Sequence, residues 1–139
     1  MTKRSQSSQQ EKHEIFNRAF DTVNAHLKNQ NHIGAYVVAY SIFEDRITAA
    51  YLLLQDHLKN KRPTEIQKIK FYQKINLLHD NGFIPQAEKN ALKACADERN
   101  RKIHAAMWNL NEFSAEDCKN VIKLARDADK LSRKLKKLT

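Results

Sequence analysis

Residues 34–60 constrain the fold more than any other stretch of this chain, because they predict a long helix that is apolar around most of its circumference. One stripe of that helix consists of Val37, Tyr40, Phe43, Ile47, Leu54 and Leu58. A helix with so little polar surface is stable only where other elements cover it. The charged triplet 44–46 interrupts the apolar run 33–54, which is therefore not expected to span a membrane. We expect it to be the core helix of a soluble, cytoplasmic protein.

The two ends of the chain predict one helix each. Residues 1–10 are rich in Ser and Gln and predict a disordered lead, after which residues 10–29 carry apolar side chains at helical spacing. Near the C-terminus, Ser114 and Asp117 predict the start of a last helix. Its apolar seam consists of Val121, Leu124, Ala128, Leu131, Leu135 and Leu138.

The middle of the chain predicts two shorter helices. Thr64 and Gln67 match a capping box for a helix over residues 64–80, and Asn81-Gly82 is a stop signal. Pro85 opens the next helix, and residues 108–113 predict a loop. The chain contains only two Gly and two Pro, which disfavours a turn-rich β architecture. We therefore predict an all-α, up-and-down bundle of four to five helices, with residues 11–139 as a single domain.

The charge balance favours an anionic partner. The chain carries a net charge of +9, and residues 119–137 alone hold eight Lys or Arg against two Asp. A second basic stretch covers residues 59–74. Such fields attract nucleic acid, and RNA is the partner we expect, although basic proteins without such a partner also exist. Cys95 and Cys118 lack metal-ligand spacing, so we expect buried free thiols, no metal and no cofactor.

The strongest chemical signal is Arg99-Asn100-Arg101-Lys102-Ile103-His104. Arginine binds phosphate through two parallel hydrogen bonds, and histidine transfers protons near neutral pH. On a straight helix Arg99 and His104 point about 140° apart, so they cannot face one small ligand. A joint site then requires that the helix loosens near Arg99 or that two chains share a cleft. Asn100 lies on the same face as His104 and is positioned to fix the imidazole tautomer.

A shared cleft suits RNA cleavage through the 2′-hydroxyl. One His104 from each of two protomers supplies a base and an acid, and Arg99 stabilises the charge that develops on the phosphorus. The alternative is that the spacing is incidental and that the basic side chains only complement the end of a helix.

Residues 92–105, read as L-K-A-C-A-D-E-R-N-R-K-I-H-A, resemble the signature of the HEPN domain family, in which Arg precedes His by a short spacer and Asn often follows the Arg. Arg99, Asn100 and His104 match these positions, and the resemblance extends over residues 33–135. It implies a homodimeric, metal-independent endoribonuclease of the kind found among toxins and defence proteins, with a protein inhibitor or antitoxin as a further partner. Ala106 stands where a large toxin group carries a modified Tyr, so we do not expect control by that modification.

An acidic residue on the core helix is also common in that family, which points to Glu44 as a support for Arg99 or His104. The residues themselves do not decide between Glu44 and Asp45, and a surface strip or a salt bridge explains both equally well. Our working hypothesis is a metal-independent ribonuclease whose site comprises Arg99, Asn100, His104 and Glu44. The alternative is a non-catalytic helical protein that binds RNA or serves as a scaffold.

Overall fold

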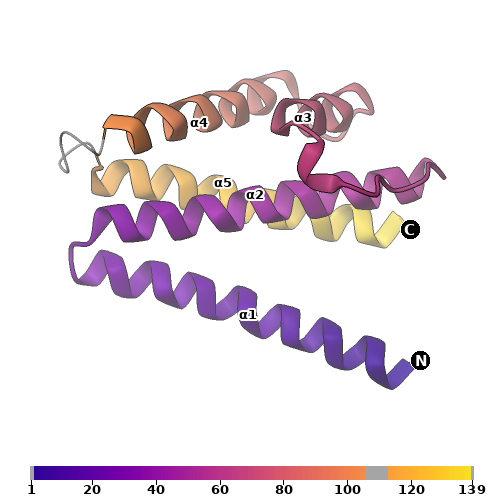
Figure 1. Cartoon of the computed structure of the whole chain (residues 1–139), viewed down its shortest axis with the longest axis horizontal. Coiled ribbons are helices and arrows are strands. Elements are labelled where there is room, and N and C mark those ends of the chain that lie inside the picture. Colours follow the sequence, from indigo (N-terminus) through magenta and orange to yellow (C-terminus); the bar gives the residue numbers. More distant parts are fainter. Residues whose placement is uncertain (1, 106–112, 139) are drawn as a thin grey trace.

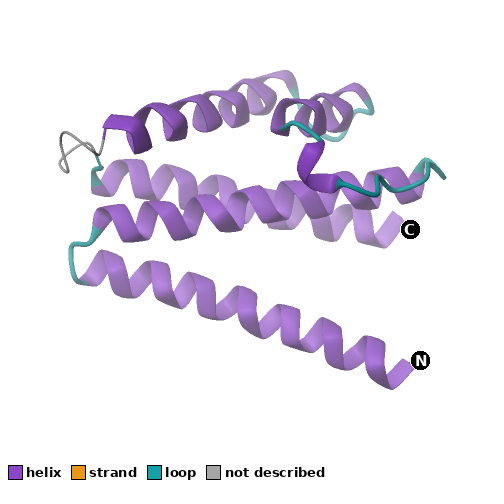
Figure 2. Cartoon of the chain, viewed as in Figure 1, coloured by secondary structure: helices purple, strands orange, loops and turns teal. Residues whose placement is uncertain are grey.

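A computed structural model describes the backbone of residues 2–105 and 113–138, and the side chains from residue 14 onwards. Its elements are α1 (Thr2–Lys28), α2 (His32–His57), a short 3-10 turn η1 (Ile66–Lys68), α3 (Phe71–Asp80), α4 (Gln86–Ala105) and α5 (Ala115–Leu138). Figure 2 shows helices and connecting loops and no strand in this part of the chain. The predicted all-α bundle is thereby confirmed.

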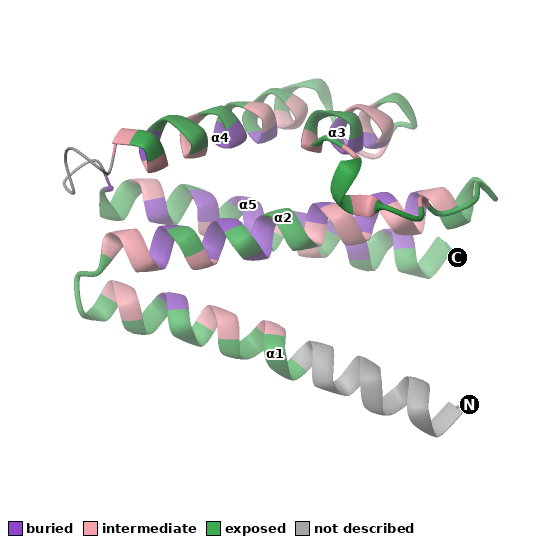
Figure 3. Ribbon diagram, viewed as in Figure 1, coloured by how far each residue is buried: buried purple, intermediate pink, exposed green. Residues whose placement is uncertain are grey.

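The central helix is α2, as its apolar circumference predicts. It packs against α1, α3 and α5, and the contact with α5 is the most extensive in the molecule (Figure 1). Figure 3 shows that buried residues gather along α2 and α5, whereas most described residues of α1 are exposed or intermediate. Phe43, Ile47 and Leu54 are fully enclosed. Burial of each such side chain stabilises the fold by about 1.5–3 kcal/mol, so α2 holds the bundle together.

The last helix follows its predicted seam and cap. Val121, Leu124, Ala128, Leu131 and Leu135 are buried, and only Leu138 at the end of the seam is exposed. The backbone N–H of Asp117 donates to Ser114 Oγ, and the N–H of Ser114 donates to Asp117 Oδ2, both over 3.1 Å. This reciprocal pair is the predicted cap, and it sets the start of α5.

Helix α1 begins at Thr2, earlier than the apolar spacing indicates. Its contact with the bundle starts at Phe16 and Phe20, whose rings meet edge to face, and Val23 is its one fully buried described residue. The helical spacing of apolar residues is present only in this packed part of the helix. Residues 2–10 have no apolar periodicity, so nothing in their pattern distinguishes a solvated helix from a disordered lead.

The predicted helix over residues 64–80 is wrong in its first half. Instead, η1 is followed by an extended residue, Ile69 (φ −80°, ψ 120°), and α3 starts only at Phe71. The cap is formed by Gln73, whose Oε1 accepts a hydrogen bond from the Lys70 N–H over 3.0 Å. The helix therefore starts at the Gln73 cap and not at the predicted Thr64–Gln67 box.

The predicted stop and restart between α3 and α4 are confirmed. Gly82 adopts φ +82°, the left-handed conformation that glycine permits without strain, and the Phe83 N–H bonds to the Leu78 carbonyl over 3.0 Å. Helix α4 then begins directly after Pro85. Most of the predicted loop 108–113 lies outside the described residues; its last member, Phe113, packs on Tyr36 with ring centroids 5.0 Å apart. None of the described helices is long and apolar enough to cross a membrane.

The role of α2 is tested by truncating one enclosed leucine. Leu54→Ala should lower the free energy of unfolding by about 2–5 kcal/mol, because the cavity it leaves cannot be filled by neighbours. Leu58→Ala is the matched control, since Leu58 is 38% exposed directly after the same helix; its cost should stay near 0.5 kcal/mol. Urea denaturation followed by circular dichroism measures both. Equal losses would mean that α2 is not the core of the bundle.

Candidate functional site

Arg99, Asn100 and His104 all lie on the last two turns of α4, which runs without a break from Gln86 to Ala105. The helix does not loosen at Arg99, so the first of the two geometries for a joint site is wrong. The two side chains diverge as the helical spacing predicts: Arg99 is half-buried, whereas His104 is exposed. Within one chain the arginine and the histidine do not converge.

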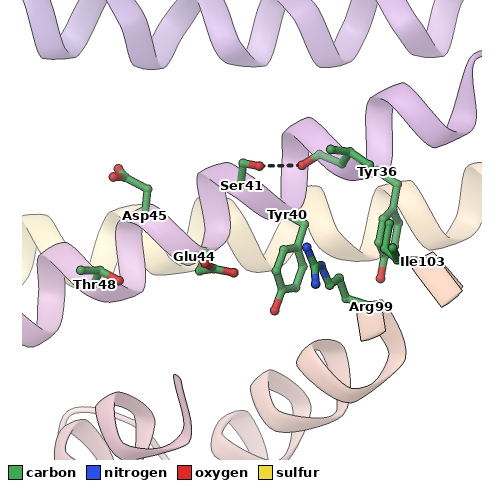
Figure 4. Close-up of a pocket in the computed structure, with 9 residues that line it drawn as sticks. Tyr36, Tyr40, Ser41, Glu44, Asp45, Thr48, Arg99 and Ile103 are labelled. Atoms are coloured by element: carbon green, nitrogen blue, oxygen red, sulfur yellow. Dashed lines mark hydrogen bonds between the residues drawn. The ribbon is translucent and has the colours of Figure 1, made fainter. Parts of the chain in front are cut away.

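Arg99 lines a cavity of about 380 Å³ between α2 and α4 (Figure 4). Two residues of α4 form one side of it, and the other side belongs to α2. The lining residues are Tyr36, Val37, Tyr40, Ser41, Glu44, Asp45, Thr48, Arg99 and Ile103. His104 and Asn100 are not among them. The cavity therefore contains two of the four predicted site residues, Arg99 and Glu44.

The guanidinium of Arg99 rests on an aromatic ring instead of a carboxylate. Its central carbon lies 5.3 Å from the centroid of Tyr40, a cation–π contact between α4 and α2. Its Nη1 donates to Asn100 Oδ1 over 3.1 Å. In the described part of the chain no acidic side chain lies within ion-pair distance of Arg99. Arg99 thus carries a positive charge that a phosphate can still neutralise.

The two acidic candidates on α2 differ in orientation. Asp45 accepts a hydrogen bond from the Nε of Arg46 over 3.0 Å, and in Figure 4 its carboxylate points away from Arg99. Glu44 points towards the Tyr40 side of the cavity in the same view. Burial, and next the charge of Glu44, raise the pKa of the Tyr40 phenol, whereas Arg99 opposes the shift. The expected salt bridge therefore belongs to Asp45, and Glu44 is the acid that shares the cavity with Arg99.

Asn100 does not hold His104 in the predicted way. Both side chains are exposed, and among the described residues the Asn100 amide is bonded to Arg99. The side chain of Asn100 therefore fixes the arginine and not the imidazole. Its role towards a bound phosphate stays a prediction.

Two buried lysines flank the site, and the sequence analysis missed both. Lys74 of α3 is 8% exposed and donates from Nζ to Thr48 Oγ1 over 2.9 Å at the cavity wall. Burial lowers the pKa of the Lys74 ammonium, and the Glu44 carboxylate opposes that shift. The signal was present, because residue 74 occupies a position on the apolar face of α3 together with Phe71, Ile75 and Leu78.

The second lysine, Lys102, ties the motif to the bundle. It is 6% exposed, and its Nζ lies 2.9 Å from Asp117 Oδ2 in the first turn of α5 and 3.7 Å from Glu98 Oε1 on α4. Burial by itself would raise the pKa of the Asp117 carboxyl, but hydrogen bonds from Lys102 and Ser114 outweigh it and hold the pKa below its usual value. The pair fixes the end of α4 that presents Arg99 and His104.

A family model matches residues 17–138 of the chain, which is nearly the whole helical domain. The chain belongs to the DUF4145 family. That family is described as a domain of unknown function, so membership fixes no activity for the site. No curated protein and no solved structure matches the chain. The resemblance of the Arg99 motif to the HEPN signature therefore remains a prediction for this DUF4145 domain.

The described cysteines and acidic side chains of the DUF4145 domain offer neither a reactive thiol nor a metal site. Both cysteines are buried and unpaired, as predicted, and burial raises the pKa of the Cys95 thiol to about 12, which keeps it protonated and a poor nucleophile. Within residues 14–105 and 113–138 no group of three His, Cys, Asp or Glu side chains lies together as a metal site would require. The Arg99 cavity is thus the best-supported site in the described structure.

The Lys102–Asp117 pair predicts a specific pH dependence of stability. A carboxyl whose pKa is lowered by folding stabilises the protein above its unfolded pKa, and the gain is lost as the pH falls through the lowered value. Asp117→Asn should therefore lower the free energy of unfolding at about pH 6, and its difference from wild type should shrink towards about pH 3. Urea denaturation at several pH values measures this. Asp21→Asn, at an exposed carboxyl on α1, is the control; an equal effect from Asp21→Asn would contradict the assignment.

Proposed function

We propose that this DUF4145 domain is a metal-independent endoribonuclease that acts as a homodimer. The observation that carries the proposal is the state of Arg99: it lines an open cavity, lacks an acidic partner within the described structure, and shares the last turns of α4 with an exposed His104. Phosphodiester cleavage needs a cation that binds the phosphate and a group that transfers a proton. Arginine supplies the first and histidine the second.

The reaction follows from the chemistry of RNA. The 2′-oxygen attacks the adjacent phosphorus as one His104 removes the hydroxyl proton, and a second His104 protonates the departing 5′-oxygen as its bond to phosphorus breaks. The products are a 2′,3′-cyclic phosphate and a 5′-hydroxyl. Arg99 stabilises the additional negative charge on the phosphoryl oxygens in the transition state.

The need for two chains follows from the straight path of α4. One chain offers one His104, about 140° around the helix from Arg99. A two-fold axis near the end of α4 brings two copies of the motif together and supplies both the acid and the base. The end of α4 lies at the end of the bundle where α2 and α5 begin, opposite the last turn of α5 (Figure 1).

The basic surface of the domain supports an RNA substrate. All eight Lys and Arg side chains of α5 are exposed: Lys119, Lys123, Arg126, Lys130, Arg133, Lys134, Lys136 and Lys137. A surface of this charge attracts the phosphate backbone without regard to sequence. The same observation favours the second candidate function, a non-catalytic protein that binds RNA through α5. A toxin or defence role, and an inhibitor that covers the cavity, are compatible with either function.

Cleavage of labelled single-stranded RNA in the presence of EDTA tests the proposal. Wild-type protein should give cyclic phosphate ends, and Arg99→Ala and His104→Ala should each reduce the rate by about 100-fold or more. Arg101→Ala is the matched control, because it removes an equal charge from an exposed position of the same helix. Cleavage that is unchanged in both site variants would contradict the proposal. RNA binding without any product would instead support the non-catalytic alternative.

A further inference from the structure

The cavity beside Arg99 is much larger than contact with one phosphate oxygen requires. Its volume of about 380 Å³ lies in the range of sites for small organic molecules. Tyr36, Val37 and Ile103 give it apolar walls, and Tyr40 adds a ring on which Arg99 already rests. Walls of this kind accept a flat, aromatic ligand by stacking.

Most polar groups around the cavity are occupied by protein partners. The Ser41 hydroxyl donates to the Val37 carbonyl over 2.9 Å, and Thr48 Oγ1 accepts from Lys74. The Tyr36 hydroxyl and the Glu44 carboxylate have no such partner among the described residues. The Tyr36 hydroxyl is buried and has no hydrogen-bond partner in the described structure. Glu44 is exposed to solvent at the edge of the cavity, and its carboxylate forms no hydrogen bond or ion pair with another described residue. The buried Tyr36 hydroxyl is costly without a partner, so a ligand that supplies one gains affinity, and the Glu44 carboxylate is available to accept hydrogen bonds from the same ligand.

We propose that this cavity binds a nucleobase and selects guanine through Glu44. The inference rests on the proposed function, in which Arg99 holds the scissile phosphate at the cavity, so that a base of one of the two nucleotides joined by that phosphate enters it. A carboxylate has two acceptor oxygens and no donor. Guanine is the base that presents two adjacent N–H donors on its Watson–Crick edge, from N1 and from the 2-amino group.

The other bases fit this acceptor pair less well. Adenine and cytosine each place an amino donor next to a ring nitrogen that accepts, so one carboxylate oxygen faces a lone pair. Uracil has a single N–H between two carbonyl oxygens, which the negative charge of Glu44 repels. A carboxylate that pairs both oxygens with donors therefore discriminates against all three, because each of them places an acceptor opposite one of its oxygens.

The position of RNA cleavage tests the guanine preference. Products from a single-stranded RNA that contains every dinucleotide step should map to steps containing guanine, favoured by about 10-fold, a typical value for a bidentate contact to a base. Glu44→Gln, which replaces one acceptor by a donor, should abolish the preference. Glu65→Gln removes an equal charge from an exposed site on the loop before η1 and should leave it intact. Uniform cleavage by the wild type, or a preference that survives in Glu44→Gln, would overturn the inference.

Binding of free nucleotides separates this inference from the proposed function. In isothermal titration calorimetry the affinity should be highest for GMP, lower for IMP and lowest for UMP, because IMP lacks only the 2-amino donor. Selective GMP binding that is lost in Glu44→Gln, in a protein that cuts no RNA, would refute the ribonuclease and retain the base site. RNA cleavage with equal binding of all three nucleotides would refute the base site and retain the ribonuclease. Circular dichroism of the variants confirms that each is folded.

Discussion

The burial of α2 is the constraint on which the rest of this structure depends. A helix that is apolar on nearly every side cannot face water, so α1, α3 and α5 are held around it. Arg46 of α2 faces α1 and α5, where it contacts Phe16 and Asp129, whereas other polar residues of α2 face the cavity beside α4. Glu44 lies on the cavity side, together with Ser41 and Thr48. The candidate site is therefore located on the side of the core helix that α1, α3 and α5 do not cover.

Helix α4 completes the site because it is anchored without closing on α2. Leu92 and Cys95 enter the core, and Lys102 fixes the other end to Asp117 of α5. Between these anchors Arg99 spans the gap to Tyr40 through a cation–π contact, which is worth about 0.5–2 kcal/mol. The gap that remains is the cavity. The Lys102–Asp117 ion pair thus stabilises the bundle and also fixes the end of α4 that carries Arg99 and His104.

Much of this fold follows from the sequence because local signals and core burial agree. The stripe of α2, the seam of α5 and the Ser114 cap each point to the structure that forms. The predicted start of α3 at Thr64 is wrong because the cap that forms joins Gln73 to Lys70, and a lysine does not match the Ser/Thr position of a capping box. For the site, helical spacing correctly separated Arg99 from His104. It could not predict the buried Lys74 or the contact of Arg99 with Tyr40, since both depend on which helices meet.

The central claim is that one active site needs residues from two chains. Unfolding and refolding wild-type protein together with His104→Ala in varying ratios produces mixed dimers, whose total RNA cleavage can be measured at a constant total protein concentration. If both histidines act in one cleft, total activity should follow the square of the wild-type fraction and fall to about one quarter at equal amounts. A fall to one half, in proportion to the wild-type fraction, would show that each chain acts alone and would contradict this account.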